Sequence, residues 1–228
     1  MGIDVSTTAS KAIVIDETGN IIASHSVEHQ LFTPYPFWSE QNPADWWQST
    51  CTAIQETLKS VAAESIKSIG LTGQMHGLVT LDEEKNCLRR ALLWNDQRST
   101  AECEIIRHMF GEEFLYAHIG GAVLPYFFAP KLLWIKRNEP HIYKKIAHIL
   151  LPKDYIRFCL SGDFCTDVSD ASGTALLNIS QRIWSESIIN KLEIPFSWLP
   201  KLYESKDVCA FVNHKAAEQT GLKIGTPI

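Results

Sequence analysis

Three strand-like segments at the start of this chain limit most strongly what it can fold into. Gly2–Val5 is short and apolar, and Lys11–Asp16 is apolar and rich in β-branched residues. After a turn at Glu17–Asn20, an extended pattern resumes over Ile21–Gln30. Consecutive strands joined by short turns pair as antiparallel neighbours. The beginning of the chain therefore predicts a three-stranded meander.

The segment after the meander predicts a helix and then an alternation of strands and helices. Asn42 is a favourable N-cap, Pro43 suits the first helical position, and apolar residues at helical spacing continue to about Ala63. Another apolar strand follows at Ile66–Thr72. This order predicts an α/β fold with a mixed sheet and helices on both faces. The ribonuclease-H-like (actin-like ATPase) domain has the same order of elements.

Composition and charge exclude several classes of protein. With 228 residues, of which 45% are hydrophobic, the chain is long enough for a sizeable core. A formal net charge of −5 disfavours a protein built to bind nucleic acid. No apolar run approaches the ~20 residues that span a bilayer, and the first residues do not resemble a secretory signal. Six scattered cysteines without zinc-ligand spacing indicate reduced thiols, and hence a cytoplasmic location.

The segment Asp4-Val-Ser-Thr-Thr-Ala-Ser-Lys11 is the first that could carry chemistry. A carboxylate at the end of a buried strand, such as Asp4, can hold Mg²⁺ or orient its waters. Hydroxyls and backbone N–H groups in the following turn can bind phosphate oxygens, and Lys11 adds a positive charge. A plain Ser/Thr-rich hairpin turn explains the same residues. The segment is not a P-loop, because the Gly-x-x-x-x-Gly-Lys-Ser/Thr pattern is absent.

Two further segments carry polar groups suited to a polyol. Gln-Met-His-Gly at 74–77 follows an apolar strand, where open α/β sheets place ligands, so His76 can hydrogen-bond a hydroxyl while Met75 shapes the wall. Trp-Asn-Asp-Gln-Arg at 94–98 combines an aromatic face with amides, a carboxylate and a guanidinium. A structural histidine and a capped helix entry near Arg98 explain these two segments as well.

Two other polar groups predict no chemistry. Thr166–Thr174 is rich in turn formers and helix N-caps, so we expect a structural loop there without specific chemistry. His25 and His29 share one face of an extended segment, but no carboxylate or cysteine accompanies them at ligand spacing. We therefore expect no metal site at the two histidines.

Taken together, segments along the chain resemble the FGGY family of carbohydrate kinases, and within it the xylulokinase branch. Residues 2–16 look like the first phosphate motif of the family. The other segments are, in order, Trp38–Trp47, Gly73–Gly77, Leu93–Arg98, Ala129–Trp134, Leu151–Tyr155 and Asp170–Thr174. They cover nearly the whole chain in the order of the family, and about the first half of its usual length.

The resemblance implies a sugar-binding N-terminal domain over residues 1–228 and a C-terminal ATP-binding domain beyond it. ATP and Mg²⁺ are the implied cofactors, and the implied partners are a sugar, MgATP and the chain's own C-terminal domain; a homodimer stays open. Met75 and His76 fall on a pair that is Met-His in xylulokinases and Arg-Glu in glycerol kinases, which favours xylulose over glycerol. The implied site residues are Asp4 at magnesium and phosphate, Thr7, Thr8 and Lys11 at phosphate, and Gln74, Met75, His76, Trp94 and Asp96 at the sugar.

Two departures from the family pattern affect the implied function. Ser6 stands where most of the family has Gly in the first phosphate turn. The general base of the family, an Asp in a Gly-Gly-Asp-Asn-type motif, is expected beyond Ile228, so no catalytic residue is expected in this chain and the chain alone should be inactive. The implied function is one half of a kinase that converts D-xylulose to D-xylulose 5-phosphate. A kinase for gluconate, ribulose or another polyol, and a non-catalytic actin-like binding protein, stay open.

Overall fold

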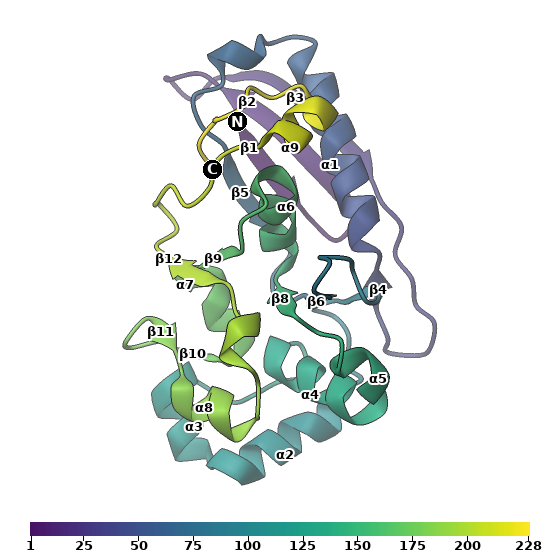
Figure 1. Cartoon of the computed structure of the whole chain (residues 1–228), viewed down its shortest axis with the longest axis vertical. Coiled ribbons are helices and arrows are strands. Elements are labelled where there is room, and N and C mark those ends of the chain that lie inside the picture. The colour runs from purple at the N-terminus through teal and green to yellow at the C-terminus, as the bar shows by residue number, and fades with distance from the viewer.

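The computed structural model describes residues 1–228 and has two lobes stacked along its long axis (Figure 1). The upper lobe contains a four-stranded sheet and the long helix α1 (Pro43–Leu58), and the lower lobe is mostly helical. Both chain ends lie in the upper lobe beside β1 (Gly2–Val5). There the N–H of Gly70 donates to the carbonyl of Met1, and the N–H of Ile69 to that of Pro227.

The sheet of the upper lobe has the strand order β3-β2-β1-β5. β1 pairs antiparallel with β2 (Ala9–Ile15) and parallel with β5 (Gly70–Gly73), and β2 pairs antiparallel with β3 (Ile21–Glu28). The predicted meander is confirmed. The parallel strand makes the sheet mixed, as the order of elements predicted.

Alternation along β2 explains which face of the sheet is buried. Ser10, Ala12 and Val14 are buried, whereas Lys11 is exposed. Successive side chains of a strand point to opposite faces, so the buried set lines one face. Helix α1 covers that face, and the Ser10 hydroxyl donates to the Trp46 carbonyl of α1 at 3.3 Å.

Helix α1 begins where the sequence predicts and ends earlier. The side chain of Asn42 accepts the N–H of Ala44 at 3.3 Å, and Pro43 occupies the first turn. The helix ends at Leu58 instead of continuing to about Ala63. There the N–H of Ser60 bonds the Thr57 carbonyl, a tighter turn that closes the helix before the short 3-10 turn η1 (Ala63–Ser65).

Helices α1 and α6 (Pro152–Ser161) pack against the sheet. Helix α6 lies beside α1 and backs β1 and β5. The opposite face carries Asp4 with Lys11 and Thr72 directly across from it on the neighbouring strands. Charged and polar side chains do not form a dry core with a helix unless they are paired, so this face stays open.

Short strands and helices build the middle and the lower lobe. The strands pair as β4–β7, β6–β8, β9–β12 and β10–β11. Their bounds are β4 (Glu40–Gln41), β6 (Val79–Leu81), β7 (Ala91–Leu92), β8 (His148–Leu150), β9 (Cys165–Asp167), β10 (Leu177–Asn178), β11 (Ile183–Trp184) and β12 (Lys201–Tyr203). The helices are α2 (Thr100–Phe110), α3 (Glu112–Ile119), α4 (Phe128–Asn138), α5 (Pro140–Tyr143), α7 (Val168–Ala171), α8 (Glu186–Lys191) and α9 (His214–Thr220), with 3-10 turns η2 (Ser172–Thr174) and η3 (Phe196–Trp198).

Each lobe has its own hydrophobic core. The core of the upper lobe contains 22 buried residues and that of the lower lobe 25, so the two cores are similar in size. Helix α6 belongs to the upper core through Ile156 and Leu160, whereas α7 belongs to the lower core through Val168 and Ala171. The segments between these two helices therefore join the lobes.

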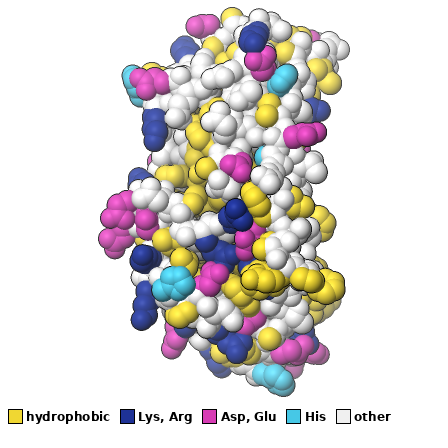
Figure 2. All heavy atoms as spheres, turned by 90° about the vertical axis from the view of Figure 1, so that its right-hand side faces the viewer, with side chains coloured by type: hydrophobic (Ala, Val, Ile, Leu, Met, Phe, Trp, Pro, Cys, Tyr) yellow, Lys and Arg dark blue, Asp and Glu magenta, His cyan; other side chains and the backbone are white.

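The surface is mixed in character. None of the helices combines the length and apolarity needed to cross a membrane. Some large hydrophobic side chains are exposed, among them Tyr35 and Phe37 in the loop after β3. Figure 2 shows exposed hydrophobic side chains gathered in the lower half of one face, between charged ones. The end of the loop after β3 is anchored by Trp38, whose ring packs edge-on against that of Trp134 at a centroid distance of 5.3 Å.

Candidate functional site

Asp4 and Lys11 lie next to each other on the open face of the sheet. They stand directly across the β1–β2 pair, and Thr72 stands across from Asp4 on β5. The Asp4 carboxylate is half-buried and has no hydrogen-bond donor or cation of the protein as a partner. The chain contains no cluster of three or more His, Cys, Asp or Glu that could hold a metal ion. Asp4 therefore offers one free carboxylate ligand and not a complete metal site.

Ser6 closes the turn between β1 and β2. Its hydroxyl donates to the Ala9 carbonyl at 2.9 Å and accepts the N–H groups of Thr8 and Ala9 at 3.4 and 3.2 Å. Ser6 does not have a positive φ angle, so a serine fits this turn without backbone strain. Because Ser6 occupies the two N–H groups, the exposed hydroxyl of Thr8 is the polar group that the turn presents to solvent.

Thr7 connects this turn to two distant segments. The indole N–H of Trp94 donates to Oγ1 of Thr7 at 2.9 Å, and this hydroxyl lies 3.4 Å from Oε1 of Gln74. The amide of Gln74 donates to Oε1 of Gln41 at 2.9 Å, and the amide of Gln41 donates to the carbonyl of Thr7 at 2.7 Å. This ring of hydrogen bonds fixes the turn against the segments that carry Gln74 and Trp94.

His76 lies at the tip of the loop that follows β5. Its φ of 62° is in the left-handed region, which is uncommon for a residue with a side chain. Nδ1 lies 2.8 Å from the Gly173 carbonyl, and the ring contacts Tyr126 and Phe127 with centroids 5.1 and 5.2 Å away. Burial lowers the pKa of His76, the Gly173 carbonyl opposes this shift, and the charge of Lys131 adds to it. The imidazole is therefore neutral at pH 7.

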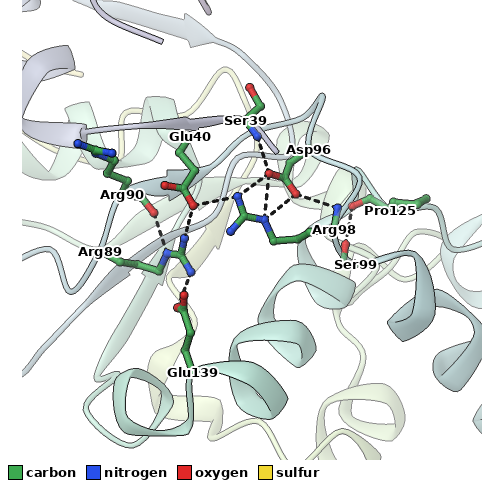
Figure 3. Close-up of polar contacts among 9 residues, drawn as sticks. All are labelled: Ser39, Glu40, Arg89, Arg90, Asp96, Arg98, Ser99, Pro125 and Glu139. Carbon is green, nitrogen blue, oxygen red and sulfur yellow. Dashed lines mark hydrogen bonds and ion pairs between the residues drawn. The ribbon is translucent and has the colours of Figure 1, made fainter. Parts of the chain in front are cut away.

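Asp96 is completely buried and belongs to a network of charged groups (Figure 3). Its carboxylate accepts the Ser39 N–H at 2.7 Å and the guanidinium of Arg98 at 2.7 to 3.0 Å. Arg98 also pairs with Glu40 at 2.8 Å. No ligand atom could reach Asp96 in this conformation, so the expected sugar contact at Asp96 would require that the network open. As it stands, the network fixes residues 94–98 against β4 and thereby positions Trp94.

A cleft of about 650 Å³ lies along the edge of β5 that is not paired with another strand. Residues of β5 and of the loop after it line one side, and residues of β9, α7 and β12 line the other. Met75, which is 56% exposed, and His76 both reach this cleft. The cleft therefore has an exposed thioether and an imidazole among the groups that line it.

Charged side chains line another part of the same cleft. Lys153 of α6 lies 2.7 Å from carboxylate oxygens of Asp154 and Asp167 and 3.2 Å from one of Asp170. Burial raises the pKa of Asp170, although Lys153 opposes the shift. We expected no specific chemistry in Thr166–Thr174, but this segment supplies two of the carboxylates and the carbonyl that holds His76. Its composition of turn formers gave no sign of these contacts.

The structure places the predicted site residues in two groups. Met75 and His76 reach the cleft, whereas the residues of the β1–β2 hairpin and Trp94 lie outside it. Gln74 is buried between the two groups and hydrogen-bonds on the side of the hairpin, where its amide donates to Gln41 and its carbonyl oxygen lies 3.4 Å from the Thr7 hydroxyl. The group outside the cleft is Asp4, Thr7, Thr8, Lys11 and Trp94.

Two residues that hold His76 were not predicted. Lys131 of α4 donates from Nζ to the His76 carbonyl at 2.9 Å, and Gly173 accepts from the ring. Each lies within a segment that resembles the family, Ala129–Trp134 for the first and Asp170–Thr174 for the second. That resemblance was the only signal in the sequence, because nothing in a single sequence indicates which distant segments will touch.

Comparisons with known proteins agree with these observations. Residues 1–228 match the model of the N-terminal domain of the FGGY family of carbohydrate kinases. The chain is 42% identical over 224 residues to the xylulose kinase of Bacillus subtilis (strain 168), an alignment that covers 97% of this chain and 45% of that protein. The chain thus spans about half the length of the curated relatives that it matches.

Solved structures show the same fold. The crystal structure of xylulose kinase from Rhodospirillum rubrum aligns with a TM-score of 0.95 at 28% identity, over 99% of this chain and 47% of that one. The crystal structure of gluconate kinase from Lactobacillus acidophilus aligns with a TM-score of 0.93 at 25% identity, over 100% and 46%. The predicted actin-like α/β architecture is confirmed. The chain belongs to the FGGY family of carbohydrate kinases and represents its N-terminal domain.

Proposed function

We propose that this chain is the sugar-binding half of an ATP-dependent kinase that phosphorylates D-xylulose to D-xylulose 5-phosphate. The hydrogen bond from Trp94 to Thr7 carries this proposal, because it joins a sugar-side segment to the turn expected at the phosphates. Phosphoryl transfer depends on alignment of donor and acceptor groups rather than on covalent catalysis. Similarity to xylulose kinases supports the choice of sugar.

The sugar would bind at the end of the cleft near the loop after β5. The exposed thioether of Met75 supplies an apolar wall, and the neutral imidazole of His76 can exchange a hydrogen bond with a hydroxyl. Trp94 lies outside the cleft and is 44% exposed, so its ring can cover the C–H face of a sugar that extends out of the cleft, while its N–H holds Thr7. Gln74 and Asp96 are buried and act by positioning these groups.

The phosphates would bind on the turn and on the open face of the sheet. The exposed side chains of Thr8 and Lys11 are free to meet phosphate oxygens. Thr7 can redirect its hydroxyl proton from Gln74, 3.4 Å away, toward a phosphate oxygen. Fixed donors and positive charge of this kind stabilise the charge on a transferring phosphoryl group.

Mg²⁺ fits the residues present through a single ligand. Asp4 has a half-buried carboxylate without a protein partner, on the same face as Lys11. Mg²⁺ in nucleotide sites is commonly held by one or two carboxylates together with phosphates and waters. When bound with ATP, the ion would neutralise phosphate charge, and Asp4 would hold it in place.

The rest of the reaction requires groups beyond these residues. We propose that a C-terminal domain following residues 1–228 supplies the ATP site and an aspartate general base, a step worth about 10²–10⁴-fold in rate. Closure of the two domains would keep water from the phosphoryl group. All six cysteines are free, which fits a cytoplasmic enzyme.

One other substrate class has an observation in its favour. The gluconate kinase from Lactobacillus acidophilus aligns over the whole chain with a TM-score of 0.93. An acid sugar would need a cation near its carboxylate, and Arg157 and Lys153 line the cleft that His76 reaches. Both cations already contact Asp154, which leaves less positive charge for an anionic substrate and favours a neutral ketose.

The test is ADP release from MgATP by the complete protein, with D-xylulose, L-ribulose, gluconate, glycerol or no sugar, beside the 228-residue chain. We expect xylulose-dependent release by the complete protein only. ADP release with another substrate would agree with a sugar kinase of this family but would rule out xylulose as its substrate. If a well-folded complete protein releases no ADP with any sugar, a non-catalytic binding role replaces the proposal. Release by the 228-residue chain would show that the second domain is dispensable.

A further inference from the structure

We propose that Lys131 is a positioning residue that holds the carbonyl of His76 and so aims Nε2 of the imidazole at a sugar hydroxyl. The sugar's identity rests on the proposed function, whereas the arrangement of Lys131 and His76 does not. Lys131 lies in the first turn of α4, on a different element from the loop that carries His76.

The surroundings of Lys131 are unusual for a lysine. Its side chain is completely buried, yet no carboxylate lies within ion-pair distance of it. Nζ donates instead to two backbone carbonyls, those of His76 at 2.9 Å and Tyr126 at 2.8 Å. Burying a cation without a counter-ion is unfavourable, and an apolar side chain of similar size would fill the space more cheaply. Only a long side chain with a donor at its end can reach both carbonyls from this position.

Both carbonyls belong to segments that hold the imidazole. His76 has a left-handed backbone with φ of 62°, a conformation that persists only when its surroundings enforce it. Tyr126 and Phe127 flank its ring. Lys131 donates to the carbonyls of both His76 and Tyr126. It therefore connects the loop that carries His76 to the segment whose aromatic rings flank the imidazole.

The remaining contacts fix which nitrogen faces the sugar. Nδ1 of His76 lies 2.8 Å from the Gly173 carbonyl, which can only accept, so Nδ1 carries the proton. A Cβ on Gly173 would lie 2.5 Å from the ring, so only glycine at this position leaves room for the imidazole. In the neutral ring Nε2 is then an acceptor, suited to the O–H of a ketose.

The charge of Lys131 helps to keep the imidazole neutral. The charged groups that face Lys131 are Asp96 and Arg98 from the segment after β7 and the ring of His76. Burial lowers the pKa of Lys131 to about 7, and Asp96 opposes this shift. Burial lowers the pKa of His76, and the Lys131 charge lowers it further. Removing that charge should therefore raise the pKa of His76.

The kinetic test uses the complete protein with Lys131→Met and, as matched control, Lys136→Met. Lys136 is on the same helix but pairs with Glu193, away from the cleft. We expect the KM for the sugar to rise about tenfold in Lys131→Met, because the loop loses the hydrogen bond that aligns Nε2 of His76, with the KM for ATP unchanged. Equal sugar KM values in the two variants would overturn the inference.

A second measurement is independent of activity. Histidine side-chain NMR of the complete protein, with His76→Asn to assign the signal, gives the titration midpoint of His76. We expect the midpoint to rise in Lys131→Met and to stay unchanged in Lys136→Met; an unchanged midpoint in Lys131→Met would overturn the inference. If Lys131→Met does not fold, Lys131→Gln keeps a donor without the charge and should give the same rise. If the complete protein is inactive with every sugar, the proposed function is wrong. The NMR titration still tests the role of Lys131, because it does not depend on activity.

Discussion

At the scale of single residues, the hydroxyl of Thr7 joins the two groups of site residues. It accepts the indole N–H of Trp94 and lies 3.4 Å from Gln74, which precedes the loop at the cleft. Neither the turn nor the loop is held in place by hydrophobic packing alone, because both present exposed side chains. The relative position of the two groups therefore depends on a few polar contacts.

Trp94→Phe in the complete protein removes the indole N–H while keeping an aromatic face. We expect kcat/KM for the sugar to fall about tenfold, because a lost hydrogen bond and a displaced turn both weaken alignment. Steady-state ADP release measures the effect. Trp47→Phe is the matched control, because its indole donates to Gln219 at 3.0 Å on an exposed surface away from the site. A similar loss in both variants would mean that the Trp94–Thr7 contact has no special role.

The buried Lys131 also makes stability depend on pH. Its pKa is lowered from 10.5 to about 7 by burial, so above pH 7 the folded protein holds a neutral amine while the unfolded chain still binds the proton. Unfolding then takes up a proton, and raising the pH from 7 toward 10 should stabilise the 228-residue chain relative to Lys131→Met. Urea unfolding of both proteins at several pH values measures this. A constant difference between them would show that Lys131 is charged throughout.

At the scale of elements, the sequence predicted what depends on neighbouring residues. The meander and the start of α1 follow from strand alternation and from the Asn42-Pro43 cap, both of which are local. The open face of the sheet was not predicted, because helix periodicity does not say which face a helix will cover. The contacts of Thr166–Thr174 with Lys153 and His76 were also missed, since the segments that meet there are far apart in the chain.

Helix α1 provides the test of a local prediction. Asn42→Ala removes the acceptor for the Ala44 N–H, so we expect a loss of about 1 kcal/mol in the free energy of unfolding. For a chain of this size, the thermal midpoint should fall by about 2–4 °C. Calorimetry of the 228-residue chain gives both values. Asn42→Asp keeps an acceptor oxygen and should recover most of the loss; an Asp variant as unstable as the Ala variant would point to the Asn42–Asp45 contact instead.

At the scale of the whole molecule, the two cores are joined by a buried cluster of charges. Lys153 lies on α6, which packs in the upper core, and its partners Asp167 and Asp170 lie at the start of the lower lobe. Burial opposes the charge of Lys153, but the surrounding carboxylates outweigh it and raise its pKa. The cluster also lines the cleft between the lobes, so the contacts that hold the lobes together shape the proposed sugar site.

Lys153→Met should therefore destabilise the contacts between the lobes more than it destabilises either hydrophobic core. Three carboxylates would lose their shared cation, and breaking a buried ion pair from one side typically costs about 3–5 kcal/mol. Lys59→Met is the control, because Lys59 pairs with Glu56 on the surface, where solvent screens such a pair and it contributes little to stability. Urea unfolding of the 228-residue chain gives both losses, and amide hydrogen exchange shows where they act. We expect exchange in Lys153→Met to accelerate first in β9 and β12 while α1 stays protected. A loss no larger than that of Lys59→Met would mean that the two cores hold the lobes together without the cluster.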